Sequence, residues 1–215
     1  MSDPPDRLLI LRLAPFVPYL TIPVGLYLLE SAWAAILLYH AGMLAVLATA
    51  RARNAWTALR LGWSPTWGLG ALAVSAALGP AFLFLQSTLG LGGEVLAQAL
   101  ARFGLAGPSW FAFVLYYSTV HPVIEEAYWR GFLAPAVRRP GLTDCAFAGY
   151  HGLVLALFVP WIAVVLAVLG LCVVAMGWRR LARQLGGLAV PLASHAVADL
   201  SFMLALALAL SRSRS

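Results

Sequence analysis

Charge is scarce in this chain, and lysine is absent altogether. Only 10% of the 215 residues are charged, 62% are hydrophobic, and the mean hydropathy is +0.88. Soluble domains carry roughly 25% charged residues, so the composition excludes an ordinary soluble protein. Apolar runs of about 20 residues match a bilayer core roughly 30 Å thick. The composition predicts a membrane protein that crosses the bilayer several times and folds as one helical domain over residues 1–215.

Cysteine is nearly absent as well, which excludes several kinds of site. Cys145 and Cys172 both fall in apolar runs and lack Cys-x-x-Cys spacing, which argues against a disulfide framework and against a cysteine-rich zinc site. An apolar environment also disfavours a reactive thiolate, so we expect two buried core cysteines rather than a nucleophile. A removable signal peptide is not expected, because residues 1–7 hold two aspartates and two prolines in place of a basic region.

Arginine alone supplies the positive charge, with 14 residues and a net charge of +6. Most arginines lie between apolar runs, where they orient a membrane protein and do not form a nucleic-acid surface. The set predicted to face the cytoplasm is Arg7, Arg12, Arg51, Arg53, Arg60, Arg138, Arg139, Arg179, Arg180 and Arg183. Arg102 lies in an opposite loop, and Arg212 and Arg214 would lie outside if the spans number seven. Usage rich in Ala, Leu, Gly and Arg suggests a GC-rich bacterial genome, so we expect the cell inner membrane.

The apolar runs predict an all-α, polytopic membrane fold with about seven to eight transmembrane helices around a polar intramembrane site. They lack strand-like alternation, and backbone groups in lipid must be satisfied within their own segment. Residues 14–50 carry one formal charge, Glu30, and as a single helix would be about 56 Å long, so we predict two crossings with a turn near Glu30. Further spans are predicted at residues 66–89, 108–129, 145–159, 160–177 and 187–210.

Ionisable residues interrupt three of these spans. An ionisable group at the centre of a membrane helix costs roughly 2.5 to 3.5 kcal/mol on insertion scales, so such a group is usually functional. Glu125, His151 and His195 lie 13, 12 and 12 residues from the nearest predicted basic loop. Because these separations are similar, the three side chains are expected at one depth, where they can share a site.

The two adjacent glutamates are predicted to have different partners. Glu126 and Arg130 are four residues apart and share one face of an α-helix, whereas Glu125 points about 100° away. Our hypothesis is that Arg130 holds Glu126 while Glu125 acts as a general base. A carboxylate and a histidine facing a water-filled cavity can deprotonate water for attack on a carbonyl, and a second histidine can donate to the oxyanion. This chemistry hydrolyses a peptide bond without a covalent intermediate.

Three motifs in this order carry a family resemblance. They are Glu125-Glu126-x-x-x-Arg130, Phe147-x-x-x-His151 and His195-x-x-x-Asp199. Over residues 120–202 the set resembles the CAAX protease and bacteriocin-processing family of glutamic intramembrane endopeptidases, which includes the type II CAAX prenyl endopeptidases. The resemblance implies a helical fold in which Glu125 and His151 activate water. It also implies that His195 and Asp199 stabilise the oxyanion. We expect that no cofactor or metal is required and that the substrate is a membrane-anchored protein or peptide.

Two details qualify the resemblance. The position of Asp199 is often asparagine in the prenyl-protein enzymes, and an ionised aspartate cannot donate to an oxyanion. Asp199 is therefore either protonated, or it orients His195 from one helical turn away. The run His121-Pro122-x-x-Glu-Glu is similar to the myxosortase branch, which implies a C-terminal sorting tail as substrate. A CAAX-like terminus and a leader peptide are the other substrate candidates.

Plainer interpretations remain open beside these. Glu126 and Arg130 could form only a structural ion pair, and His121 is better explained by a kink at Pro122 than by a place in the site. The candidate site residues Glu125, His151, His195 and Asp199 could instead ligate zinc or a non-haem metal, although the His-Glu-x-x-His spacing is absent. A non-proteolytic membrane partner, such as a bacteriocin immunity protein or a scaffold, is the alternative function.

Overall fold

The computed structural model describes residues 10–133 and 141–212. Arg7, Arg138, Arg139 and Arg214, part of the predicted charge pattern, lie outside these ranges. The helices are η1 (Ala14–Phe16), α2 (Val17–Pro23), η2 (Val24–Leu28), α3 (Ala32–Thr49), α4 (Arg53–Ala58), α5 (Pro65–Ala76), α6 (Leu78–Leu85), α7 (Gly93–Arg102), α8 (Pro108–Glu125), η3 (Glu126–Leu133), α9 (Leu142–Leu155), α10 (Trp161–Leu185) and α11 (Ala189–Arg212). The described residues contain no strand.

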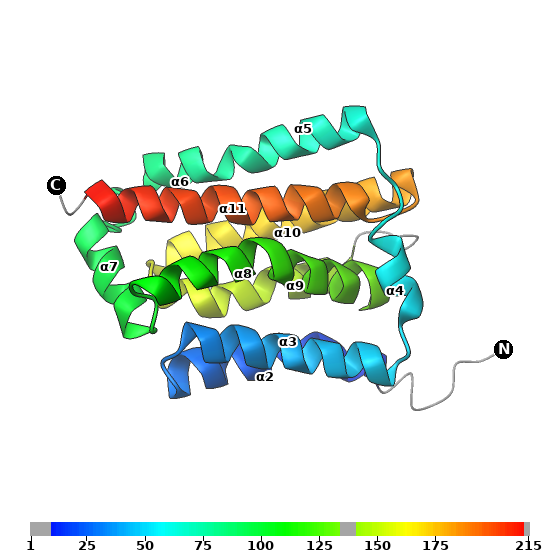
Figure 1. Ribbon diagram of the computed structural model, residues 1–215, viewed down its shortest axis with the longest axis horizontal. Coiled ribbons are helices and arrows are strands. Elements are labelled where there is room, and N and C mark those ends of the chain that lie inside the picture. Colours follow the sequence, from blue (N-terminus) through cyan, green and yellow to red (C-terminus); the bar gives the residue numbers. More distant parts are fainter. Residues whose placement is uncertain (1–9, 134–140, 213–215) are drawn as a thin grey trace.

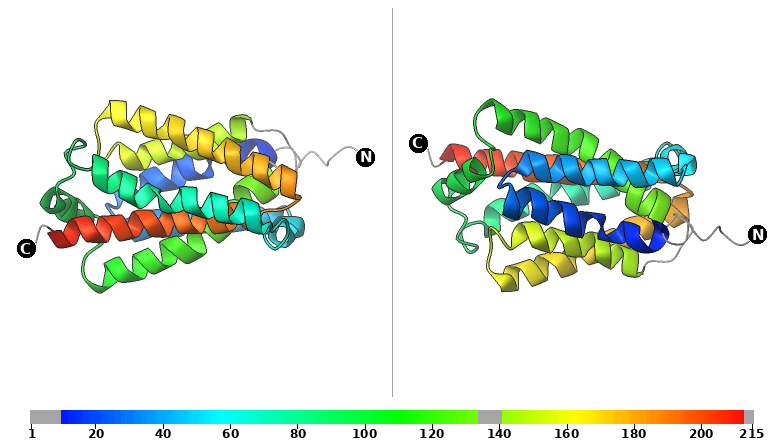
Figure 2. Two further views of the ribbon diagram at one scale, coloured as in Figure 1. Left: turned by 90° about the horizontal axis from the view of Figure 1, so that it is seen from above. Right: turned by 90° about the horizontal axis from the view of Figure 1, so that it is seen from below.

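Long helices run side by side as a bundle, with the two chain ends at opposite ends of it (Figure 1). Among the described residues, five helical segments are long and apolar enough to cross a membrane: Ile10–Leu28, Ala32–Thr49, Pro65–Leu85, Trp161–Leu185 and Ala189–Arg212. The continuous helix formed by α8 and η3, together with α9, lies between α11 and α3 in Figure 1, and Figure 2 shows α8 and α10 at opposite edges of the bundle. The all-α, polytopic membrane fold is therefore confirmed.

The predicted turn near Glu30 joins the first two long helices. Glu30 has a positive φ of 45°, and the Ser31 hydroxyl caps the next helix by accepting a backbone N–H three residues on. Gly25 lies against Ala35, where an added Cβ would come within 2.2 Å of the Ala35 Cα. Arg102 donates to the Glu30 carboxylate, and this hydrogen bond and the guanidinium charge lower the pKa of Glu30. The close packing of η2 against α3 on the two sides of this turn therefore requires a glycine at position 25.

Prolines inside two helices are each followed by a π-helical segment. Pro23 ends α2 and η2 follows, while Pro122 lies within α8 and η3 follows. A proline removes one backbone hydrogen bond and clashes with the preceding turn, so the helix must adjust its winding nearby. In α8 the change falls between Glu125 and Glu126. Single π-turns are frequent at functional sites, and this one separates the directions of the two adjacent carboxylates.

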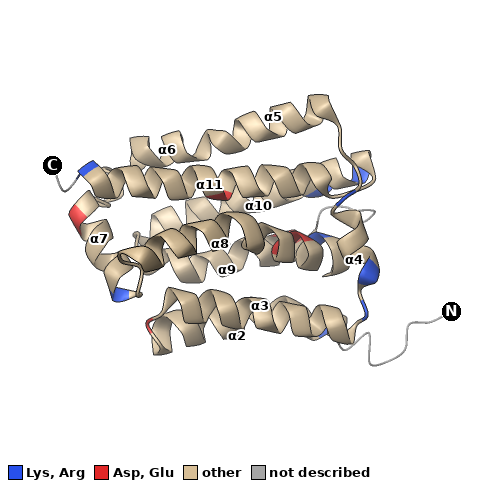
Figure 3. Cartoon of the chain, in the orientation of Figure 1, with Lys and Arg blue, Asp and Glu red and all other residues tan. Residues whose placement is uncertain are grey.

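Arginine gathers at one end of the bundle, as the sequence predicts (Figure 3). This end carries α4 and the connection from α10 to α11, whereas Arg102 and Arg212 close α7 and α11 at the other end. One expectation was wrong. Arg179 does not lie in a basic loop but is buried, with 1% of its surface exposed, because α10 continues to Leu185 rather than ending near residue 177.

The two cysteines face each other across the α9 and α10 interface. Cys145 Sγ and Cys172 Sγ are 2.8 Å apart, and both residues are free and only half-buried, so the expectation of two buried core cysteines was wrong. We expect air oxidation with copper phenanthroline to join them within one chain, because adjacent thiols on packed helices can reach disulfide geometry. Loss of both thiols to maleimide labelling, with the chain still monomeric on a non-reducing gel, is the measurement.

The Cys172→Ser variant is the control for this cross-link and should retain one labelled thiol. Two thiols that stay labelled after oxidation of the unmodified chain, or a disulfide-linked dimer, would show that α9 and α10 are not packed as described.

Candidate active site

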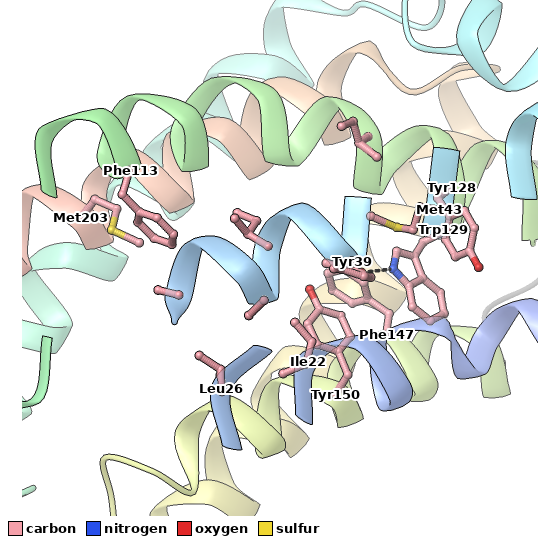
Figure 4. Packing of buried hydrophobic residues seen from close by; sticks show 14 of the residues in the cluster. Ile22, Leu26, Tyr39, Met43, Phe113, Tyr128, Trp129, Phe147, Tyr150 and Met203 are labelled. Atoms are coloured by element: carbon pink, nitrogen blue, oxygen red, sulfur yellow. Dashed lines mark hydrogen bonds between the residues drawn. The ribbon is translucent and has the colours of Figure 1, made fainter. Parts of the chain in front are cut away.

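Glu125 ends α8 and is completely buried. Its Oε1 accepts a hydrogen bond from the Tyr39 hydroxyl at 2.5 Å and another from the Tyr150 hydroxyl. The Trp129 indole N–H donates to the Tyr39 oxygen at 2.8 Å, and Figure 4 shows these rings packed around one point. Among the described residues Glu125 Oε2 has no hydrogen-bond partner. One oxygen of the carboxylate is thus fixed by the protein, and the other is left for a bound molecule.

Glu126 begins η3 and points to different partners. Its Oε1 accepts from Arg130 and from His195 Nδ1, the latter at 2.9 Å. The Arg130 guanidinium lies 4.4 Å from the Phe147 ring centroid and 4.9 Å from that of Trp178. All of this is buried, and the predicted pairing of Glu126 with Arg130 agrees with the structure. Glu126 is consequently paired with an arginine, while its Oε2, like Oε2 of Glu125, has no hydrogen-bond partner among the described residues.

His195 joins the two glutamates. A carboxylate can only accept, so the Nδ1 of His195 must donate to Glu126, and Nε2 is left facing the site. This Nε2 lies 3.6 Å from Glu125 Oε2 and 3.7 Å from Asp199 Oδ2. The ring stacks on Trp178 with centroids 4.8 Å apart. The ring orientation of His195 is therefore determined by Glu126 and Trp178, and Asp199 approaches the same nitrogen without a hydrogen bond.

His151 lies at the edge of this group, on α9. Its Nδ1 is 3.0 Å from the Phe147 carbonyl oxygen, which can only accept, so Nδ1 carries the proton and Nε2 keeps its lone pair. The ring stacks on Tyr150 with centroids 4.1 Å apart, and the residue is half-buried. The structure thus connects His151 to Glu125 through Tyr150, and the residue keeps an accessible basic nitrogen.

His121 is inside the site, and the expectation that it only accompanies the Pro122 kink was wrong. Its Nε2 is 3.4 Å from Glu125 Oε2, and its Nδ1 is 3.0 Å from His40 Nε2. His40 Nδ1 is in turn 2.7 Å from the Tyr116 hydroxyl. Sequence reasoning missed His40, although an ionisable residue inside an apolar span was a usable signal.

A buried ion pair between Arg179 and Asp144 joins the helices that carry the site. Arg179 Nε donates to both oxygens of Asp144, at 2.7 and 2.9 Å, and Arg179 Nη2 donates to the Trp129 carbonyl at 3.2 Å. Asp144 also accepts from the Gly141 backbone N–H at the start of α9. This pair links α9, η3 and α10, the elements that hold Tyr150 and Trp129 near Glu125.

The structure brings together the predicted residues from three separate motifs. His195 lies within 4 Å of both glutamates and of Asp199. His151 does not touch them directly in these contacts, but its ring stacks on Tyr150. Buried polar atoms left without a partner in the described residues include His121 Nε2, Glu125 Oε2 and Asp199 Oδ2. Buried polar groups are normally hydrogen-bonded, so these atoms mark a place for water, substrate or an ion.

The segment that carries most of these residues is similar to a known protein family. Residues 107–201 match the family model described as Rce1-like, type II CAAX prenyl endopeptidase Rce1-like. No curated protein and no solved structure matches the chain. The match is to the family as a whole, so the narrower assignment to the myxosortase branch stays a prediction. The matched segment covers less than half of the chain and contains all three motifs, and over this segment the chain is similar to the type II CAAX prenyl endopeptidase Rce1-like family of membrane proteases.

Proposed function

We propose that this protein is an intramembrane glutamic endopeptidase that hydrolyses a peptide bond of a membrane-anchored protein. The observation that carries the proposal is the state of Glu125. Two tyrosine hydroxyls orient its Oε1, while its Oε2 is buried, unpartnered and next to His195. A carboxylate held in this way, in a site that excludes bulk water, is suited to general-base catalysis.

Glu125 and His151 activate the water. A water bound to Glu125 Oε2 transfers a proton to that oxygen as its own oxygen attacks the substrate carbonyl carbon. His151, with its lone pair on Nε2, assists by accepting a hydrogen bond from the same water or from the leaving amine as it forms. When the tetrahedral intermediate collapses, the carbon–nitrogen bond breaks and the proton on Glu125 passes to the amine. Atoms and charge balance, and no covalent enzyme intermediate is formed.

His195 stabilises the oxyanion. Because Nδ1 already donates to Glu126, His195 can donate to an oxyanion from Nε2 only as the imidazolium. Asp199, 3.7 Å from that nitrogen, then orients the ring and balances its charge, in place of a direct contact with the oxyanion. This role explains why an aspartate can function at position 199, where the prenyl-protein enzymes often have asparagine. Glu126 and Arg130 act as positioning residues behind His195.

The substrate is a protein or peptide anchored in the same membrane. Glu125 is the last residue of α8, and η3 continues from it to pack against α4 at the arginine-rich end of the bundle, so the site is nearer to that end (Figure 3). A scissile bond close to the membrane surface at the arginine-rich end of the bundle would reach the site around Glu125. A C-terminal sorting tail, as in the myxosortase branch, a CAAX-like terminus and a leader peptide all present such a bond.

The test compares membrane and surface proteomes of the native host carrying the unmodified protein or the Glu125→Ala variant. Proteins whose termini stay uncleaved in the variant are expected to accumulate and to share a terminal segment, which identifies the substrate class. Mass spectrometry of protein termini is the measurement.

Equal amounts of the two proteins in the membrane are required for the comparison. The Glu94→Ala variant is a matched control, because Glu94 is exposed on α7, far from the site in sequence and fold. Termini that do not differ between the Glu125→Ala strain and the control would contradict the peptidase and favour the non-proteolytic partner.

A further inference from the structure

Four side chains in the middle of the site form what we call the central cluster: His121, Glu125, His195 and Asp199. One ligand atom from each of His121, His195 and Asp199 lies within 4.8 Å of the others. Glu125 Oε2 lies against both histidines. The cluster therefore presents two imidazole nitrogens and two carboxylate oxygens toward one small volume.

Three of the separations within the central cluster suit a metal ion better than a water molecule, and the ligand atoms of His121, His195 and Asp199 all lie within 4.8 Å of one another. Zinc bonds to nitrogen and oxygen of about 2.0 to 2.2 Å place tetrahedral ligand atoms roughly 3.3 to 3.6 Å apart. Hydrogen bonds of about 2.7 to 3.0 Å to a central water would place its partners roughly 4.4 to 4.9 Å apart. The distances that the structure shows are 3.4 Å for His121 to Glu125, 3.6 Å for His195 to Glu125 and 3.7 Å for His195 to Asp199.

Both histidines are held in the way that metal-ligating histidines usually are. Such a histidine donates its other ring N–H to a carboxylate or another acceptor, which orients the ring. His195 donates Nδ1–H to Glu126 at 2.9 Å. His121 Nδ1 is 3.0 Å from His40 Nε2, and in the tautomer where His121 is the donor its Nε2 keeps a lone pair. In each histidine of the central cluster, Nε2 faces the proposed ion and Nδ1 has a hydrogen-bond partner of its own.

Charge also favours a cation at this place. Arg130 is paired with Glu126, and the other buried guanidinium, Arg179, is paired with Asp144. No arginine pairs with Glu125 or Asp199 among the ion pairs of the described residues, although Glu125 is fully buried and Asp199 is 13% exposed. Buried charges in proteins are paired or coordinate metals. A divalent ion would balance both carboxylates at once.

We propose that the central cluster is a binding site for a divalent transition-metal ion of the zinc type. The ion occupies the position beside Glu125 Oε2 that the attacking water needs. It also binds the lone pair of His195 Nε2, which is absent when His195 is the imidazolium that stabilises the oxyanion. Zinc therefore competes with catalysis and inhibits the enzyme reversibly. The inhibition, unlike the binding itself, rests on the proposed peptidase function.

The experiment measures zinc binding by the full chain purified in detergent. The chain has four histidines, and the adjacent thiols could bind zinc separately, so all proteins carry the Cys145→Ser and Cys172→Ser changes. Titration of zinc against a chromophoric chelator is expected to give one ion per chain. The His121→Gln change should weaken binding about 100-fold, and His40→Leu, which removes only the partner of a ligand, roughly 10-fold.

The His151→Gln variant is the matched histidine control and should bind zinc as the parent does, since His151 lies outside the central cluster. Elution as a single species in size-exclusion chromatography shows that each variant is folded, and Asp199→Asn replaces His121→Gln if the latter fails to fold. Binding of less than one zinc ion per parent chain would overturn the site. Binding that stays unchanged in His121→Gln and in Asp199→Asn would overturn it as well.

Activity separates this proposal from the proposed function. Cleavage that zinc inhibits and a chelator restores, with less inhibition in the His40→Leu variant, supports the competition. Stoichiometric zinc binding by a chain that cleaves nothing would refute the peptidase and keep the site. Cleavage by a chain that binds no zinc would refute the site and keep the peptidase.

Discussion

The Glu125→Gln variant of the purified protein is expected to lose about 1,000-fold in kcat/KM while remaining folded. General-base catalysis contributes roughly 100- to 10,000-fold, and a glutamine side chain cannot accept the water proton. Its amide oxygen can still accept from the Tyr39 and Tyr150 hydroxyls that hold the carboxylate in place. Cleavage of a peptide derived from the substrate identified in the host is the measurement, with thermal unfolding recorded on the same preparation.

Two matched variants make this result interpretable. Glu94→Gln makes the same chemical change on an exposed turn of α7 and should leave both cleavage and unfolding unchanged. Glu126→Gln removes the charge that faces Arg130, so it should lower stability as well as activity. A Glu125→Gln protein that cleaves normally would contradict the general-base role. A Glu125→Gln protein that simply unfolds would favour a structural cluster that joins helices.

The Arg179→Met variant is expected to lose about 3 to 5 kcal/mol in its free energy of unfolding. Breaking a buried ion pair leaves an uncompensated charge inside the protein, and that is the usual size of the effect. Here Asp144, 1% exposed, would remain without its guanidinium, and the Trp129 carbonyl would lose a donor. The free energy of unfolding is measured by titration with sodium dodecyl sulfate in mixed micelles.

Arg180→Met is the control for this prediction, because Arg180 is the next residue and is exposed. It should change stability by less than about 0.5 kcal/mol. Adding Asp144→Asn to Arg179→Met should recover part of the loss, since asparagine carries no charge and can still accept from the Gly141 N–H. Equal effects of the two arginine variants would show that Arg179 is not buried in the protein.

Cleavage in the Arg179→Met variant should also fall, even under conditions where the protein is folded. Arg179 contacts Asp144 on α9 and the Trp129 carbonyl on η3, and these two elements carry the groups around Glu125. The effect is one of positioning. It should therefore appear mainly in kcat, with a pH profile that keeps its shape.

Local features of the chain were predictable because they depend on residues close in sequence. Hydropathy over about 20 residues indicates a membrane helix in any fold, and the helical spacing of Glu126 and Arg130 places them together whatever surrounds them. The similar distance of Glu125, His151 and His195 from basic loops also predicted that these side chains lie close together. The structure places His195 against Glu125, and the His151 ring stacks on Tyr150, which donates to Glu125. These properties required only the helix geometry and the bilayer thickness.

Tertiary packing decided the partners of these groups. Tyr39 lies 86 residues from Glu125 and His40 lies 81 residues from His121, in a span whose sequence shows no motif. Arg179 was predicted to lie in a loop because two arginines follow an apolar run. In the structure α10 continues past both arginines, and Arg179 is buried against Asp144. Contacts between helices depend on how those helices are rotated and packed, which periodicity in one segment does not specify. The sequence by itself thus determined the membrane helices and the catalytic candidates, whereas only the packed bundle decided which oxygen of Glu125 is held and which is free.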